Sequence, residues 1–517
     1  MQSNAAREKR FNKKEWSWIM YDWANSIYAT NIMAAIYPTI FASMVEGGDI
    51  RWGYATSAAT LIVALLAPVL GAIADYRGMK KKLFTLFMLI GVVFTPLMAF
   101  FGSWKVALIG YVISRIGFSG SCLFYDSFLT DVTTDERMDK VSSWGYAMGY
   151  IGGSTIPFVI SIAVLLMCGF GSTFAQVFSV LIVSVWWLIF SIPMLKNVEQ
   201  THYIEKPRSF SLKHVFGNVW HTFKKICTNR GLLFFVLAYF FYIDGVDTII
   251  SISTAYGTTL GLGTVGMIIA LLVTQIVAMP CSILFARISE KFSARKALIG
   301  AVIIYLAVTL VGFYMGYSME PSKEAFEKAF DDAYARLEID DSRADWYQAE
   351  LRAILLDEKD ASPEMAAVIE KLDQELDDYS DLEFTALAKD VIKPAMLAAA
   401  RENSDKIAAF RDAISFSTVL FWIMAVMVGT VQGGIQAVSR SYFGKLIPKK
   451  QSNEYYGFFD IFGKFAAFMG PFIYATVGQL SGRSSYGVLG LSLLFVIGLV
   501  LLIVGGRSME ADERMEK

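Results

Sequence analysis

The chain has 517 residues, of which 55% are hydrophobic and 18% are charged. Soluble globular proteins carry roughly 45–50% apolar and about 25% charged residues, so this composition disfavours both a soluble and a disordered protein. The net charge of −1 disfavours a nucleic-acid binder, and the four cysteines are too widely spaced to indicate a disulfide framework or a zinc site.

Twelve apolar segments follow one another along the chain, and a membrane helix needs about 20 such residues. In the clearest region, 141–195, 55 consecutive residues include no Asp, Glu, Lys or Arg, and we interpret it as two spans joined at 168–173. The other spans are expected at about 16–44, 52–74, 83–104, 106–127, 231–258, 264–286, 297–317, 413–439, 455–480 and 484–506. The first run is too long for the apolar core of a cleavable signal peptide, so none is expected. The sequence predicts an all-α membrane protein with twelve transmembrane helices.

Basic residues in the loops predict the orientation, because cytoplasmic loops are enriched in Lys and Arg. With the N-terminus inside, the inner segments carry 29 basic residues, whereas the short outer loops carry three, Arg51, Lys105 and Arg483. We therefore expect both termini to be cytoplasmic and the chain to lie in the cytoplasmic membrane.

The region 318–412 interrupts the pattern after the ninth span and is expected outside the cell. It holds 12 Lys and Arg against 25 Asp and Glu. Apolar residues recur at helical spacing in 324–337 and 364–376, and the first of these helices could extend the ninth span into solvent. We interpret the region as an acidic helical insert, either a cap without chemistry or a domain that captures substrate or docks an extracytoplasmic partner.

Short internal matches indicate two six-helix halves. Asp22 and Asn25 in the first span correspond to Asp244 and Asp247 in the seventh, and 74–83 corresponds to 289–298. Beyond the insert the offset between matching segments grows by about the length of the insert. We therefore divide the chain into a six-helix half at 1–195, a cytoplasmic linker with an amphipathic helix at 196–230, helices seven to nine at 231–317, the insert at 318–412, helices ten to twelve at 413–506 and a cytoplasmic tail at 507–517.

The loop GAIADYRGMKKKL at 71–83 lies between the second and third spans. It resembles the loop signature of the major facilitator superfamily, in which a Gly, an Asp, a second Gly and basic residues recur at fixed spacing. The matching residues are Gly71, Asp75, Gly78 and Lys80, with Arg77 as a partial substitute for a basic residue that usually follows the Asp. The resemblance implies that this loop gates the transporter by contacting the inner ends of neighbouring helices.

Within that superfamily the chain resembles the vacuole effluxer-like family, whose yeast relative exports amino acids from the vacuole during autophagy. The resemblance is carried by YDWANSIYAT (21–30), FYDSFLTDV (124–132), GYIGG (149–153), YIDGVDT (242–248), GGIQAVSRSYFGKLIP (433–448) and GFFDIFGKFAAFMGP (457–471). It covers both halves but not the insert. It implies a secondary transporter that works by alternating access of two halves.

Polar residues inside predicted spans are candidates for the transport site, because a charge in the bilayer centre costs roughly 2.5–3.5 kcal/mol on insertion scales. Asp244 and Asp247 could bind an ammonium group or pass a proton, and Asp22 with Asn25 occupies the matching place. The alternative is an interhelical salt bridge, for instance with Arg115.

Other polar residues of the spans leave two interpretations open. Arg115 could hold a substrate carboxylate or neutralise an acid of the first or seventh span. The amides Gln275, Gln432 and Gln436 are expected to make helix-packing hydrogen bonds or to contact the cavity. Asp460 and Lys464 are expected to form an intrahelical ion pair.

The sequence indicates no cofactor. Its three histidines fall in 196–230. His214 and His221 could share a helix face, but two imidazoles without a nearby acid make a poor metal site, and nothing resembles GxxxxGK[ST]. The preferred function is secondary transport of a small polar solute, with proton-coupled amino-acid efflux as the specific expectation, and an enzyme is disfavoured. The alternatives are a membrane receptor or scaffold that acts through the acidic insert, and a drug or amphiphile exporter.

Overall fold

The computed structural model describes residues 10–45, 48–100, 103–169, 172–205, 212–262, 264–357 and 382–516. The regular secondary structure of this part of the chain is helical, apart from one isolated parallel bridge between Tyr76 and Ile204. Eleven of its helices are long and apolar enough to cross a membrane. The first predicted span, at about 16–44, is not among these eleven and brings the number to twelve. Its helix is interrupted, since α2 (Lys13–Ile27) continues through the π-helical η1 (Tyr28–Ala34) into α3 (Ile36–Met44).

The first half of the chain forms one bundle. A π-helical stretch, η2 (Gly149–Thr155), interrupts its fifth span and packs against α2. The GYIGG run permits this contact, because a Cβ on Gly152 would lie within the ring of Trp23. After α3 the bundle consists of α4 (Gly48–Ala74), α5 (Met79–Phe100), α6 (Trp104–Ser127), α7 (Leu129–Val132), α8 (Asp135–Met148), η2 (Gly149–Thr155), α9 (Ile156–Cys168) and α10 (Thr173–Asn197).

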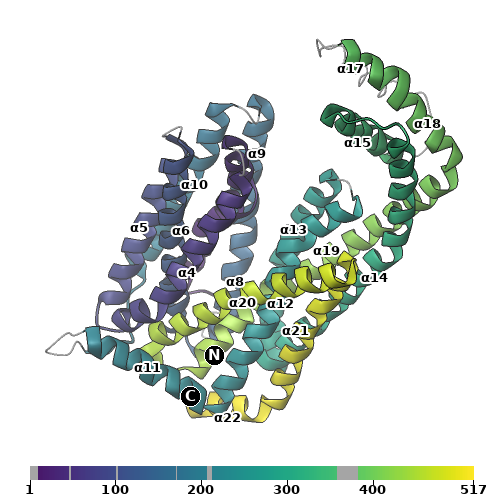
Figure 1. Cartoon of the computed structure of the whole chain (residues 1–517). Coiled ribbons are helices and arrows are strands. Elements are labelled where there is room, and N and C mark those ends of the chain that lie inside the picture. Colours follow the sequence, from purple (N-terminus) through teal and green to yellow (C-terminus); the bar gives the residue numbers. More distant parts are fainter. Residues whose placement is uncertain are drawn as a thin grey trace.

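The second half forms a second bundle beside the first (Figure 1). It is connected to the first by α11 (Leu212–Thr228), and α22 (Gly506–Glu516) follows its last span. Both of these helices lie on the face that carries the chain ends, at the bottom of Figure 1. The spans of this half are α12 (Arg230–Leu260), α13 (Thr264–Phe292), α14 (Ala294–Ala335), α19 (Ser404–Leu446), α20 (Ser452–Ser481), which follows the short η4 (Lys449–Gln451), and α21 (Ser484–Val504).

The insert rises from the second half on the face opposite the termini (Figure 1). α14 is 42 residues long and runs without a break from the ninth span into the insert, as the sequence indicated for 324–337. The helix expected at 364–376 lies outside the described residues. The remaining described elements are α15 (Ser342–Asp357), α17 (Leu382–Leu387), η3 (Ala388–Ile392), α18 (Lys393–Glu402) and the first turns of α19.

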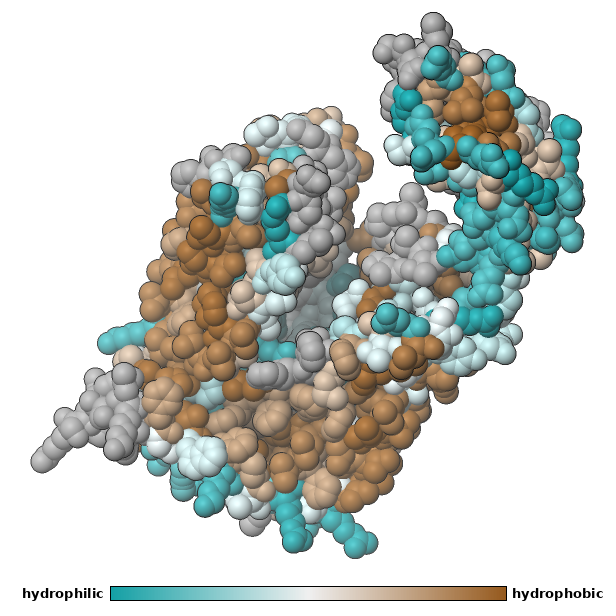
Figure 2. Space-filling view, viewed as in Figure 1, coloured by the Kyte–Doolittle hydropathy of each residue, from teal (hydrophilic) through white to brown (hydrophobic). Residues whose placement is uncertain are grey.

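Apolar side chains cover the flanks of both bundles, whereas hydrophilic residues gather on the insert and on the termini face (Figure 2). Leu65, Val93 and Ile109 are each more than half exposed. Exposed apolar surface of this extent would be unfavourable in water but is covered by lipid tails in a bilayer. The helical backbone also suits a bilayer, because its N–H and C=O groups hydrogen-bond to each other and need no water.

The two bundles contact each other near the termini face and diverge toward the insert (Figure 1). α20 of the second half packs along α4, and α8 of the first half packs against α13 and α19. This arrangement leaves space between the halves on the insert side.

Candidate functional site

A cavity of about 790 Å³ lies between the halves, where Figure 2 shows the surface hollowed. Helices α4 and α6 line it from the first half, and α12 and α20 line it from the second. Its volume is in the range of sites that bind small molecules. Its polar lining residues are Thr56, Ser57, Thr60, Arg115, Asp126, Tyr239, Asp247, Tyr456, Asp460 and Lys464.

The cavity contains side chains of both charges, two of which the sequence singled out as site candidates. Arg115 contacts the sulfur of Met33, and its Nε atom is buried without a hydrogen-bond partner. Asp247 lines the cavity from the other half. Among the ion pairs of the described residues, none joins Arg115 to an acid of the first or seventh span. The predicted pair of Asp460 and Lys464 forms within α20, and it also lines the cavity.

Asp244 has different surroundings from Asp247. Its side chain is fully buried, and Oδ1 accepts hydrogen bonds from the backbone N–H of Gly470 at 2.9 Å and from the Thr248 hydroxyl at 3.4 Å. Gly470 belongs to α20, so Asp244 connects two helices of one half. The two acids that the sequence treats as one pair therefore have different surroundings, although both lie on α12.

The matching pair in the first span also lies away from the cavity lining. Asp22 Oδ2 accepts a hydrogen bond from the Tyr125 hydroxyl at 2.8 Å. The amide of Asn25 contacts the Cys122 sulfur at 3.7 Å. Both contacts join α2 to α6, so these residues hold helices of the first half together.

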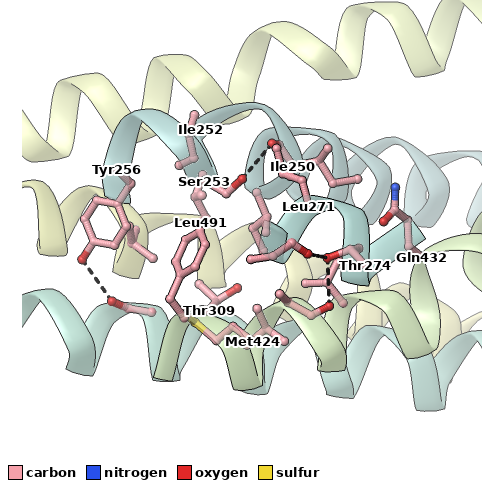
Figure 3. A pocket seen from close by; sticks show the side chains of 18 of the residues that line it. Ile250, Ile252, Ser253, Tyr256, Leu271, Thr274, Thr309, Met424, Gln432 and Leu491 are labelled. Carbon is pink, nitrogen blue, oxygen red and sulfur yellow. Dashed lines mark hydrogen bonds between the residues drawn. The ribbon is translucent and has the colours of Figure 1, made fainter. Parts of the chain in front are cut away.

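Two of the three amide candidates line a different cavity, of about 110 Å³, inside the second half (Figure 3). Gln275 and Gln432 are polar members of a mostly apolar lining, and the Gln275 Oε1 atom is buried without a hydrogen-bond partner. Gln436 lines neither this cavity nor the larger one. The geometry therefore places none of the three amides on the wall of the cavity between the halves.

The signature loop between α4 and α5 connects the halves on the termini face. Asp75 Oδ1 accepts hydrogen bonds from the backbone N–H and the side-chain amide of Asn453 at 3.0 and 2.7 Å, and Oδ2 accepts from the N–H of Glu454 at 3.1 Å. Asp75 thus caps the N-terminus of α20 from the opposite half. Burial raises the pKa of Asp75 to about 7, although the charge of Lys80 and the α20 donors act to lower it. A Cβ on Gly71 would approach the Asn453 carbonyl oxygen to 2.4 Å, so the loop needs glycine there.

Lys80 completes this contact between the halves. Its buried ammonium lies 2.6 Å from Asp131 Oδ2 and donates to the Ser452 hydroxyl of α20 at 3.1 Å. Gly78 has a φ of +71°, which favours glycine in the turn before α5. Arg77 lies at the surface, where its ion pair is exposed on both sides and contributes little stability.

Arg440 in α19 is a functional candidate that the sequence did not reveal. Its Nη1 lies 2.9 Å from Asp126 Oδ1 and its Nη2 lies 3.4 Å from Asp22 Oδ2, so it forms ion pairs with two acids of the first half. The predicted tenth span ended at 439 because a charge followed, whereas α19 continues to Leu446. The signal that could have found it is helical spacing, since Arg440 lies one turn after the candidate Gln436.

Comparison with known protein families matches residues 52–326 and 416–509 to the family described as vacuole effluxer Atg22 like. The "Uncharacterized MFS-type transporter YxiO" of Bacillus subtilis (strain 168) is 37% identical over 508 residues, which cover 96% of this chain and 95% of that protein. "Autophagy-related protein 22" of Yarrowia lipolytica is 28% identical over 141 residues, which cover 23% of each chain.

Solved structures of transporters have the same fold. The Escherichia coli fucose:proton symporter FucP aligns with a TM-score of 0.58 at 12% identity and covers 94% of this chain and 96% of its own. A bacterial homologue of the iron transporter ferroportin, in an outward-facing state, aligns with a TM-score of 0.53 at 11% identity over 96% of this chain and 98% of its own. At these identities the likeness concerns the fold alone, which is the twelve-helix major facilitator fold.

Proposed function

This chain belongs to the vacuole effluxer Atg22-like family, and we propose that it exports amino acids across the cytoplasmic membrane in exchange for protons. It is a multi-pass membrane protein and a secondary transporter of the major facilitator type. The substrate, the coupling ion and the direction of transport are our proposal.

The observation that carries the proposal is the pair of opposite charges in the cavity between the halves. Arg115 lies on the wall formed by the first half, and Asp247 lies on the wall formed by the second. A guanidinium suits a carboxylate, and a carboxylate suits an ammonium group, so the two residues fit the ends of a zwitterion. A solute bound between them would touch both halves, as alternating access requires.

The proposed coupling to protons rests on Asp247, which lies on the wall formed by the second half. Asp247 lines the cavity, and carboxylates within the membrane are typical members of proton relays in transporters. Asp126 is a second acid on the wall of this cavity. At Asp247, a proton and the ammonium group of a substrate would compete for one carboxylate. Such competition is the simplest physical basis for exchange of one for the other.

The orientation of the chain is proposed from its charges. The inner segments carry the excess of basic residues, so we assign the termini face to the cytoplasm and the insert to the outside. With this assignment the halves are in contact on the cytoplasmic side and apart on the outer side. The structure then corresponds to an outward-open state.

The test is transport by the purified full chain in proteoliposomes. We expect counterflow of labelled amino acids, and accumulation when a proton gradient is imposed. Arg115→Gln should weaken the apparent affinity for amino acids at least ~tenfold, since a charge-assisted hydrogen bond contributes roughly 1.5–3 kcal/mol. Arg483→Gln is the matched control, because Arg483 pairs with Glu324 outside the cavity. Counterflow that Arg115→Gln leaves unchanged would contradict the proposed substrate site.

A further inference from the structure

The guanidinium of Arg440 is enclosed almost entirely by residues of the opposite half. Its side chain is only 4% exposed. The rings of Trp18 and Tyr146 lie 4.6 and 4.5 Å from its central carbon, and cations bind favourably at the faces of aromatic rings. Ser142 of α8 accepts two further hydrogen bonds, at 3.0 Å through its hydroxyl and at 3.1 Å through its carbonyl oxygen. We call the surrounding residues of the first half, Trp18, Asp22, Asp126, Ser142 and Tyr146, the cage. Because Arg440 belongs to the second half, the cage must release it whenever the halves separate on the termini face.

The two acids of the cage differ in their access to the cavity. The side chain of Asp22 is 12% exposed and does not line the cavity. That of Asp126 is 31% exposed and does line it. Asp126 therefore faces Arg440 on one side and the transport cavity on the other. Tyr456 joins the same two places, since it lines the cavity and donates its hydroxyl hydrogen to the Arg440 carbonyl oxygen at 2.8 Å.

We propose that Arg440 is the latch of the termini face, and that a cationic group of the transported solute releases it by competing for Asp126. The part that concerns the solute rests on the proposed transport of amino acids, whereas the latch itself does not. Asp126 and Asp247 line the same cavity, so an ammonium group held there can reach both acids. Asp126 cannot fully compensate two cations at once, so the ammonium group weakens its ion pair with Arg440. The cage then holds Arg440 mainly through Asp22, and the contact between the halves becomes weaker. Occupancy of the site is in this way communicated to the gate.

The release of the latch can be followed with a cysteine on the termini face. Met138 of α8 is fully buried, and its sulfur packs against Gly444 of α19 in the opposite half. Met138→Cys, introduced after replacement of the four native cysteines, should react with thiol reagents only when the halves separate there. The labelling rate is measured on the purified full-length chain in detergent, with and without a mixture of L-amino acids. N-acetyl amino acids, which lack the cation, are the matched solute control.

The latch predicts a result for each variant. Arg440→Gln removes the cation that pairs with both Asp22 and Asp126 in the closed state, so basal labelling should rise ~tenfold or more and amino acids should have no further effect. Arg440→Lys keeps the charge and should restore part of the slow basal rate. Asp126→Asn removes the same ion pair that the ammonium group weakens, so basal labelling should rise and amino acids should give no further stimulation. Lys445→Gln is the control. It removes an ion pair with Asp139 that also bridges the halves, with Nζ 2.7 Å from Oδ1, but neither residue lines the cavity. This variant should preserve the fold-stimulation by amino acids.

The outcomes separate the latch from the substrate class. If amino acids do not stimulate labelling of the Met138→Cys reporter that keeps Arg440 and Asp126, the proposed substrate is wrong. The basal labelling rate of Arg440→Gln then still shows whether Arg440 holds the halves together. Basal labelling of Arg440→Gln equal to that of the native residue would overturn the latch. Stimulation that survives in Asp126→Asn, or that N-acetyl amino acids also produce, would overturn the competition for Asp126. Arg440→Lys and Asp126→Asn keep the test decisive if Arg440→Gln does not fold.

Discussion

At the scale of single residues, burial and partners separate side chains that the sequence makes look equivalent. Asp244 and Asp247 lie three positions apart on α12, yet one connects to the backbone of α20 and the other lines the cavity. Helical spacing fixes the angle between two side chains, but it does not fix what packs against each of them. Of these two acids, only Asp247 lines the cavity between the halves.

Asp247→Asn is expected to abolish accumulation driven by a proton gradient, because it removes the titratable group from the cavity, while counterflow of substrate survives in part. Asp244→Asn should leave the pH dependence of transport unchanged, since an amide oxygen can still accept the hydrogen bond of Gly470 at 2.9 Å. Both variants are measured in proteoliposomes over a range of pH. Normal accumulation in Asp247→Asn, or its loss in Asp244→Asn alone, would reverse this assignment.

Asp75 predicts a pH dependence of the gate. Burial in the closed state raises its pKa from the usual 3.8 to about 7, and on opening the carboxyl meets water and regains its ordinary value. The closed state thus binds the proton more tightly, so it is favoured as the pH falls and loses stability as the pH rises through about 7. Linkage gives a ~tenfold shift toward opening between about pH 6 and about pH 8.

The check compares Met138→Cys labelling at both pH values with and without Asp75→Asn. The amide cannot titrate, so the variant should lack the Asp75 part of the pH response, while the intrinsic pH dependence of thiol labelling is the same in both. Asp75→Asn also presents an NH₂ group to donors of α20, so faster basal labelling is expected. An identical pH response in the two proteins would exclude Asp75 as its source.

At the scale of elements, long helices connect the membrane body to the insert. α14 continues from the ninth span to Ala335, and α19 begins at Ser404 and continues through the tenth span. Glu320 on α14 accepts hydrogen bonds from the backbone and the hydroxyl of Ser485 at 2.8 and 2.6 Å, and so caps α21. The base of the insert is therefore fixed to the second half and should move with it.

The topology predicts that a cysteine at Ser342, the exposed first residue of α15, reacts with a membrane-impermeant thiol reagent in intact cells. The native Cys227 on α11 is exposed on the opposite face and should react only after lysis. The two sites thus serve as controls for each other in single-cysteine proteins. The reverse pattern of labelling would place the insert in the cytoplasm.

At the scale of the whole molecule, contacts that close the termini face come from both halves. Asp75 and Lys80 reach α20, Arg440 reaches α2 and α6, and Lys445 reaches α8. Each of these contacts joins a residue of one half to a residue of the other, so all of them are lost together when the halves separate. We therefore expect this face to act as one cooperative gate rather than as independent ion pairs.

Crosslinking this face should stop transport. The hydroxyl of Ser127 donates to the side-chain oxygen of Asn453 across the halves. A short, cleavable crosslinker between Ser127→Cys and Asn453→Cys is expected to abolish counterflow, because the halves can no longer separate there, and cleavage should restore it. Each single variant treated with the same reagent is the control. Counterflow that persists in the fully crosslinked protein would show that transport does not require opening of this face.

The sequence by itself determined the class of the molecule, its spans and the residues of the signature loop. These follow from local quantities, since the transfer of about 20 apolar residues into a bilayer depends on those residues alone. The intrahelical pair of Asp460 and Lys464 was predictable for the same reason, because one turn of helix brings the two side chains together.

The tertiary structure alone decided which polar residues share a cavity and which connect the two halves on the termini face. Arg440 and Asp22 are 418 positions apart, and no local pattern indicates that packing of two bundles joins them. The same packing separates Asp247 from Asp244 and assigns Gln275 and Gln432 to a different cavity from Arg115. The cost of burying a charge is local and visible in sequence, whereas the partner that offsets the cost depends on how the halves pack.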